Sequence, residues 1–193
     1  MNSLTVKKPE ILKALFKESY RNTFKDVSFY SIDKQLSDRY VKVYRNQRNG
    51  EVVVVHRGTS LSCAHDIIAD LGLLFRSYNT FRFRHAANKQ RLAERKYGAK
   101  NIITIGHSLG GAIAKKVGKN SKERITLNRP FHLNESNSDT EQDIRSELDP
   151  VSLLAKFKKN KNLITIPSTT CDLLKEHSYE VLDRISNSET NLD

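Results

Sequence analysis

The chain has 193 residues, which suits one domain with a substantial core, and its longest apolar runs are far too short to cross a bilayer. Lysine and arginine outnumber aspartate and glutamate by 33 to 22, a formal charge of +11, and the 2 cysteines exclude a disulfide framework and a cysteine-based zinc site. The N-terminus lacks the apolar core of a secretory signal, so we expect a cytoplasmic or peripheral membrane protein unless a leader is missing.

The basic residues are concentrated in three segments, Arg76 to Lys100, Lys115 to Arg124 and Lys156 to Lys161. Such a surface attracts the phosphates of membranes or of nucleic acids, but a solvated basic face without a partner explains the charge equally well. No helix-turn-helix, zinc-finger or RNA-binding aromatic motif accompanies the charge, so no specific nucleic-acid partner is expected. An anionic phospholipid surface is an equally suitable partner for this basic surface.

Hydrophobic periodicity and turn residues divide the first half of the chain into five elements. In chain order they are a helix over Pro9 to Tyr20, strands over Arg39 to Arg48 and Glu51 to His56, a short helix and loop over Ser62 to Phe75, and a basic helix over Thr80 to Tyr97. The turn at Asn49-Gly50 joins the two strands into a hairpin. The uniformly apolar run Val52 to Val55 predicts a strand buried on both faces.

The second half continues the alternation of strands and helices. The expected elements are strands over Asn101 to Ile105, Arg124 to Leu127 and Asn162 to Ile166, and helices over Ala112 to Val117 and Ser178 to Ile185. The polar stretch Phe131 to Leu148 is predicted to be a long surface loop, and Asn187 to Asp193 a disordered tail. The pattern predicts one α/β domain over residues 1–186, with a mostly parallel central sheet between helices on both faces.

The sequence Gly106-His107-Ser108-Leu109-Gly110-Gly111 lies between the strand ending at Ile105 and the helix beginning at Ala112. This is the setting of a nucleophile elbow, Gly-x-Ser-x-Gly, a strained turn that directs a serine hydroxyl toward a base and an oxyanion hole. A glycine-rich turn also arises by chance, but the flanking strand and helix favour catalysis. Ser108 is therefore the candidate nucleophile.

Two of the 6 histidines, His132 and His177, follow Ser108, as the base does in hydrolases that order serine, acid and histidine along the chain. His132 directly follows a predicted strand, and only Glu123 lies between it and Ser108 as a candidate acid. His177 has several carboxylates between itself and Ser108. It is therefore the predicted base, although an unassigned histidine is more often an ordinary surface residue.

Asp139, Asp143 and Asp149 are the plausible acids. Pro150 restricts Asp149 to extended backbone geometry, which predicts a stiffly held carboxylate. The same pair is typical of a helix N-cap followed by proline at the first helical position, and the two roles are compatible. Asp149 is therefore the predicted acid.

An oxyanion hole needs two hydrogen-bond donors. The residue after the nucleophile, Leu109, is expected to supply one through its backbone N–H. The second is expected from Thr59, because Arg57-Gly58-Thr59 directly follows the buried strand and Thr59 offers both an N–H and a hydroxyl. A simple turn at the end of a strand is the alternative interpretation of these three residues.

Five stretches together resemble the class 3 lipases, the α/β-hydrolase family of fungal triacylglycerol lipases and plant-type phospholipases A1. They are Val52 to Thr59, Asp66 to Leu71, Gly106 to Gly111, Asp149 to Val151 and His177 to Tyr179. The resemblance implies hydrolysis of glycerolipid esters through an acyl-enzyme, with no cofactor or metal. It also implies a lipid substrate at a membrane or lipid surface and a lid near Ser60 to Phe75.

The chain departs from the family pattern in its lid and acyl-binding segments. It has no tryptophan, where the pattern places one before Asp70, and Thr126 to Pro130 is more polar than expected. A second hypothesis is a non-catalytic protein on a hydrolase fold that binds lipid, nucleic acid or a protein partner, because a fold alone does not establish activity. The oligomeric state and an association with virions stay open.

Overall fold

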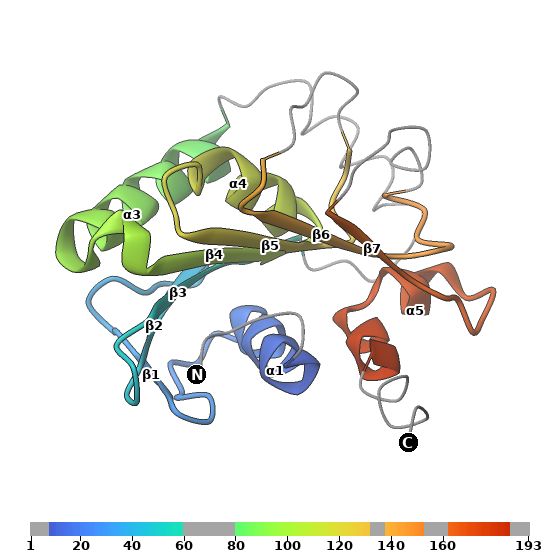
Figure 1. The fold of residues 1–193 in the computed structure, drawn as a ribbon, viewed down its shortest axis with the longest axis horizontal. Helices are drawn as coiled ribbons and strands as arrows, with labels where there is room; N and C mark the ends of the chain where they lie inside the picture. The colour runs from blue at the N-terminus through green and yellow to red at the C-terminus, as the bar shows by residue number, and fades with distance from the viewer. Residues whose placement is uncertain (1–7, 60–79, 132–137, 153–161, 186–193) are drawn as a thin grey trace.

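The computed structural model describes residues 8–59, 80–131, 138–152 and 162–185. Within them, seven strands form one sheet in the order β1-β2-β3-β4-β5-β6-β7 (Figure 1). The strands are β1 (Tyr30–Ile32), β2 (Val41–Asn46), β3 (Val52–His56), β4 (Ile102–His107), β5 (Glu123–Leu127), β6 (Glu141–Ser146) and β7 (Leu163–Ile166). β1 to β3 pair antiparallel and β3 to β7 pair parallel, so the predicted mostly parallel sheet is confirmed.

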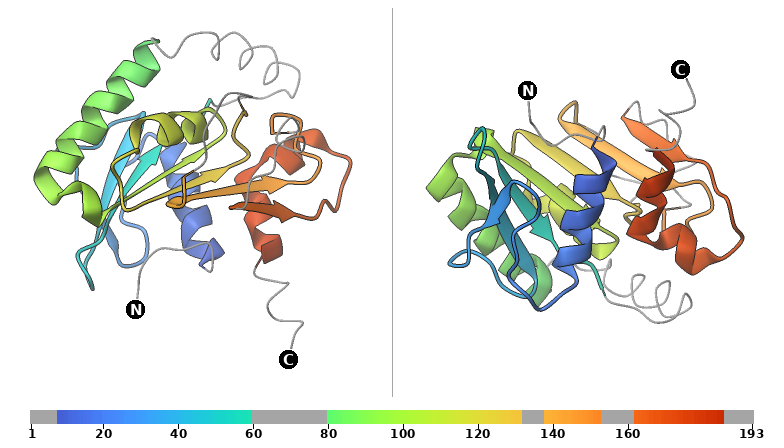
Figure 2. Two further views of the ribbon diagram at one scale, coloured as in Figure 1. Left: turned by 45° about the horizontal axis from the view of Figure 1, so that its top comes forward. Right: turned by 90° about the horizontal axis from the view of Figure 1, so that it is seen from below.

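Helices cover both faces of this sheet, as predicted (Figures 1 and 2). The helices are α1 (Pro9–Ser19), α3 (Phe81–Tyr97), α4 (Leu109–Val117), α5 (Leu173–His177), and the 3-10 helices η1 (Ala99–Asn101) and η3 (Tyr179–Leu182). In Figure 1, α3 and α4 lie above the sheet, and α1 and α5 lie below it.

The two faces of β3 explain why helices are needed on both sides. Val53 and Val55 pack in one apolar core with the buried residues of α1, whereas Val52 and Val54 pack in a second core with those of α3 and α4. All four valines are fully buried, which confirms the prediction that this strand is buried on both faces. Each fully buried side chain of this size contributes about 1.5–3 kcal/mol to folding.

One of the expected elements is wrong, and one helix was missed. The supposed loop Phe131 to Leu148 contains β6, whose polar side chains are buried in ion pairs instead of facing solvent: Glu141 with Lys115 and Asp143 with Arg129. The helix expected over Ser178 to Ile185 is present as the 3-10 helix η3 continued by α-helical residues 183–185; the separate helix before it, α5, which ends at His177, was not expected.

Several expectations fall outside the described residues: the short helix and lid near Ser60 to Phe75, the Asp66 to Leu71 segment, Cys63, His132 and the tail from Asn187. Cys171 is an exposed free thiol. In the portion of the chain with described structure, none of the helices combines the length and apolar character that a membrane span requires.

Candidate active site

Ser108 sits in a strained turn between β4 and α4. Its backbone angles are φ 56° and ψ −129°, a region that residues with side chains rarely adopt. The turn requires glycine at its flanks: a Cβ on Gly106 would lie 2.6 Å from the Gly111 nitrogen, and one on Gly110 would lie 2.9 Å from the Gly58 nitrogen. The elbow predicted from the sequence is therefore present, with Ser108 at its apex.

Three predicted site residues come together in one chain of hydrogen bonds. His177 Nε2 lies 2.9 Å from Ser108 Oγ, and His177 Nδ1 lies 2.6 Å from Asp149 Oδ1. An ionised carboxylate only accepts hydrogen bonds, so Nδ1 carries the imidazole proton and Nε2 accepts from the serine hydroxyl. Asp149 is completely buried and His177 is 5% exposed, so little water competes for these contacts.

The Asp149 carboxylate is held on its second oxygen as well. Its Oδ2 accepts a hydrogen bond from the Ser152 backbone N–H at 2.7 Å, and the turn over 149–152 is described only as far as Ser152. Asp143, another candidate acid, is engaged elsewhere, because Arg129 donates to both of its oxygens at 2.7 Å. Burial alone would raise the Asp143 pKa, but the Arg129 guanidinium lowers it.

His107, beside the nucleophile, links the elbow to the base. Its Nε2 donates to the His177 carbonyl oxygen at 2.6 Å, and its Nδ1 accepts from the Tyr20 hydroxyl at 2.7 Å. Burial lowers the His107 pKa to about 3, and the nearby His177 adds to the shift, so His107 is neutral at neutral pH. Nothing in the sequence of α1 indicates that Tyr20, at its end, reaches this site.

The two expected oxyanion donors belong to segments that meet at Ser108. Leu109 is the first residue of α4, and its N–H has no acceptor within the helix. Gly58 lies against the elbow, since a Cβ there would be 3.3 Å from Ser108 Cβ. Thr59 follows Gly58 and is half-buried. The arrangement therefore leaves the oxyanion role of Thr59 and Leu109 as a prediction.

A buried serine joined to an imidazole and a carboxylate in this order can pass a proton from the hydroxyl to the imidazole. Among the described residues, no group of three or more histidine, cysteine, aspartate or glutamate side chains is placed to hold a metal ion. The chemistry that the contacts support is nucleophilic attack by Ser108 with His177 as general base.

Solved structures of fungal lipases share this fold. The Rhizomucor miehei lipase propeptide complex matches with a TM-score of 0.56 and 17% identity, over 83% of this chain and 68% of that chain. Lip2 lipase from Yarrowia lipolytica gives 0.53 and 14%, over 83% and 77%. A triacylglycerol lipase from Penicillium expansum gives 0.52 and 16%, over 83% and 79%.

No protein-family model matches the chain, and no curated protein matches it in sequence. At such low identities the structural likeness establishes the fold, the α/β-hydrolase fold of these lipases, and confirms the predicted fold class.

Proposed function

We propose that this chain is a serine hydrolase that cleaves the carboxylic esters of glycerolipids through an acyl-enzyme. The observation that carries the proposal is the contact chain from Ser108 Oγ through His177 to Asp149, at 2.9 and 2.6 Å. The lipase-like fold supports it, because the three residues occur in the order serine, acid and histidine that such hydrolases use.

In this mechanism, Ser108 Oγ attacks the ester carbonyl while His177 Nε2 takes its proton. Asp149 holds the imidazole in the required tautomer and stabilises the imidazolium. The backbone N–H of Leu109 and the Thr59 N–H or hydroxyl bind the oxyanion, each donor contributing about 2.7–4 kcal/mol. His177 then protonates the departing alcohol, and a water activated by the same imidazole releases the acid.

A lipid substrate is supported by large apolar side chains on the segments around the site. Leu148, directly before Asp149, is 40% exposed, and Leu173 and Leu174 in α5 are 43% and 40% exposed. Phe81, at the start of α3, is 60% exposed, and its neighbour Arg82 donates to the carbonyl of Arg57 after β3. Large apolar side chains left exposed on these segments favour contact with lipid over contact with water.

The preferred lipid is anionic or zwitterionic phospholipid. Helix α3 carries six lysines and arginines and one acidic residue, Glu94. Its Arg84, Arg91 and Arg95 side chains are exposed on one face, because Arg91 lies about two helical turns and Arg95 about three helical turns after Arg84. Each basic residue close to an anionic lipid surface contributes about 1 kcal/mol to binding.

The direct test is hydrolysis of a short p-nitrophenyl ester by wild type and by Ser108→Ala. The variant should lose all measurable turnover, because the nucleophile is gone while the fold is unchanged. Undiminished turnover in Ser108→Ala would refute the assignment. An inactive but folded wild type, tested across lipid classes, would favour the alternative of a non-catalytic binding protein.

A further inference from the structure

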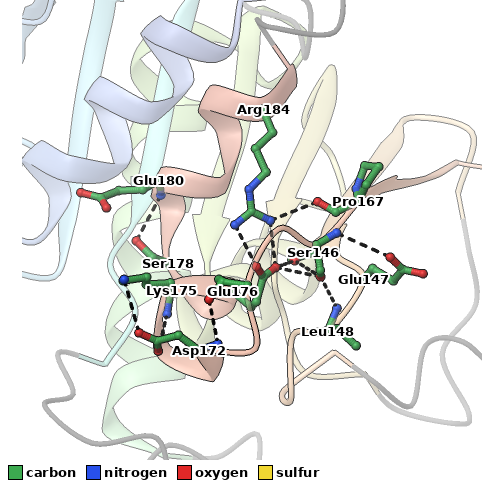
Figure 3. A network of polar contacts seen from close by, with 12 residues as sticks. Ser146, Glu147, Leu148, Pro167, Asp172, Lys175, Glu176, Ser178, Glu180 and Arg184 are labelled. Carbon is green, nitrogen blue, oxygen red and sulfur yellow. Dashed lines mark hydrogen bonds and ion pairs between the residues drawn. The ribbon is translucent and has the colours of Figure 1, made fainter.

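A buried carboxylate that the proposed reaction does not use lies directly before the base. Glu176 is completely buried and accepts hydrogen bonds from three side chains (Figure 3). Arg184 donates to both of its oxygens at 2.9 Å, and Ser168 Oγ donates at 2.9 Å. Ser146 Oγ also donates to this carboxylate. Glu176 thus joins α5 to the end of β6 and to the segment after β7.

The main chain of Glu176 is tied to the same strands. Asn128, after β5, donates from Nδ2 to the Glu176 carbonyl oxygen at 2.8 Å and accepts from the Ser146 N–H at 2.8 Å. The Ser146 carbonyl in turn accepts the Asp149 N–H at 3.2 Å. A short series of hydrogen bonds therefore runs from the residue before His177 to the backbone of Asp149.

Helix α5 depends on these contacts for its position. It has only 5 residues, too few to be stable by itself, and its two leucines are exposed. Its buried residues are Glu176 and His177, one engaged by this network and the other by Ser108 and Asp149. Polar contacts, instead of an apolar face, therefore decide where the His177 imidazole lies.

We propose that Glu176, together with Arg184, is a positioning residue that holds His177 at hydrogen-bonding distance from both Ser108 and Asp149; this rests on the proposed function. Burial would raise the pKa of Glu176, but the hydrogen bonds from Arg184, Ser146 and Ser168 lower it to about 2. The carboxylate is thus an anion at neutral pH, and its removal leaves the Arg184 guanidinium and the His177 helix without their shared anchor.

Kinetics on a soluble chromogenic ester provide the first test. Glu176→Ala should lower kcat by about 100-fold with little change in KM, because a displacement of the base by about 1 Å has an effect of this size. Glu176→Gln keeps the side-chain shape and one acceptor oxygen, so its kcat should lie between those of Glu176→Ala and wild type. Lys175→Ala, an exposed position in the same helix, is the matched control and should behave as wild type.

A readout that needs no catalysis separates this proposal from the proposed function. The short hydrogen bond from His177 Nδ1 to Asp149 should give a far-downfield proton signal in NMR spectra of wild type and Ser108→Ala, absent in Asp149→Asn. The signal should be lost in Glu176→Ala and kept in Lys175→Ala. If wild type hydrolyses no ester but the signal follows this pattern, the hydrolase proposal fails and the positioning role of Glu176 stands.

Wild-type kcat together with an unchanged proton signal in folded Glu176→Ala would overturn the proposal. If Glu176→Ala does not fold, Glu176→Gln decides: a lowered kcat with a weakened signal supports the positioning role, and wild-type values of both refute it.

Discussion

The backbone of Ser108 is the point where stability and activity conflict most directly. A positive φ at a residue with a side chain costs about 1–3 kcal/mol, and the elbow keeps it because that geometry directs Oγ at His177. The strain is maintained by the packing of Gly106 and Gly110, which leave no space for the turn to relax. An alanine at position 108 removes the hydroxyl but keeps the strain.

Glycine at this position should therefore be better tolerated than alanine. We expect Ser108→Gly to be inactive, like Ser108→Ala, but to have a free energy of unfolding higher by about 1 kcal/mol than that of Ser108→Ala. Glycine adopts positive φ without strain, which stabilises the folded state, although the greater chain entropy of unfolded glycine offsets part of this stabilisation. Urea unfolding of the two variants measures the difference. A Ser108→Gly variant no more stable than Ser108→Ala would show that the turn stores no such strain.

Two buried histidines lead to a second prediction at the residue scale, on how stability depends on pH. The His107 pKa falls from an ordinary value of 6.5 to about 3 on folding, because burial disfavours its charged form. Between these values the unfolded chain binds one more proton, so this contribution to stability is complete above pH 6.5 and decreases as the pH falls toward 3. His56, with a pKa lowered to about 4, acts in the same direction.

The pH dependence can be assigned with His107→Gln. Below pH 6.5 the free energy of unfolding of wild type should fall with a slope that includes about 1.4 kcal/mol per pH unit from His107. The variant should lose this part of the slope and keep that of His56, as thermal or urea unfolding between pH 4 and 7 would show. Equal slopes in both proteins would mean that His107 is not buried as a neutral imidazole.

At the scale of elements, strands with apolar runs were predictable, whereas the short β1 and the polar β6 were not. β3 and β4 are apolar along their length, and the periodicity of α1 and α3 matches the faces that they bury. β6 is polar in sequence, yet it is buried, because its charges pair with Arg129 and Lys115 from other segments. Sequence periodicity does not indicate ion-pair partners that are distant along the chain.

The same reasoning applies to the site. The hydrogen-bonded arrangement of Ser108, Asp149 and His177 was predictable, because motif and chain order restrict these residues to few positions; their catalytic roles are a proposal. The roles of Tyr20 and Glu176 were not predictable. Tyr20 acts through a contact with His107, which lies 87 positions away along the chain. Glu176 acts through its pairing with Arg184 and Ser146. The segment Thr126 to Pro130, more polar than the class 3 lipase pattern, is buried. Its Asn128 joins the contacts of Glu176, and its Arg129 pairs with Asp143.

At the scale of the whole molecule, the charge of +11 should act through the basic surface of α3. We expect faster hydrolysis of phospholipid in anionic than in zwitterionic vesicles. The preference should disappear as added salt shortens the Debye length from about 30 Å at 0.01 M to about 3 Å at 1 M. Substituting glutamine for Arg84, Arg91 and Arg95 should reduce it similarly.

The control for this experiment is a soluble short-chain ester, which the triple variant should hydrolyse at the wild-type rate because α3 supplies none of the site residues. A preference for triacylglycerol emulsions that does not change with salt would argue against phospholipid and against α3 as the surface that meets it.

The central claim, a reactive serine assembled with His177 and Asp149, is tested most directly by a fluorophosphonate probe followed by peptide mass spectrometry. We expect one adduct, on Ser108, in folded wild type. It should be absent in Ser108→Ala and form far more slowly in His177→Ala, because the hydroxyl then has no base. Folded wild type that remains unlabelled, or that carries the adduct on another residue, would contradict the account.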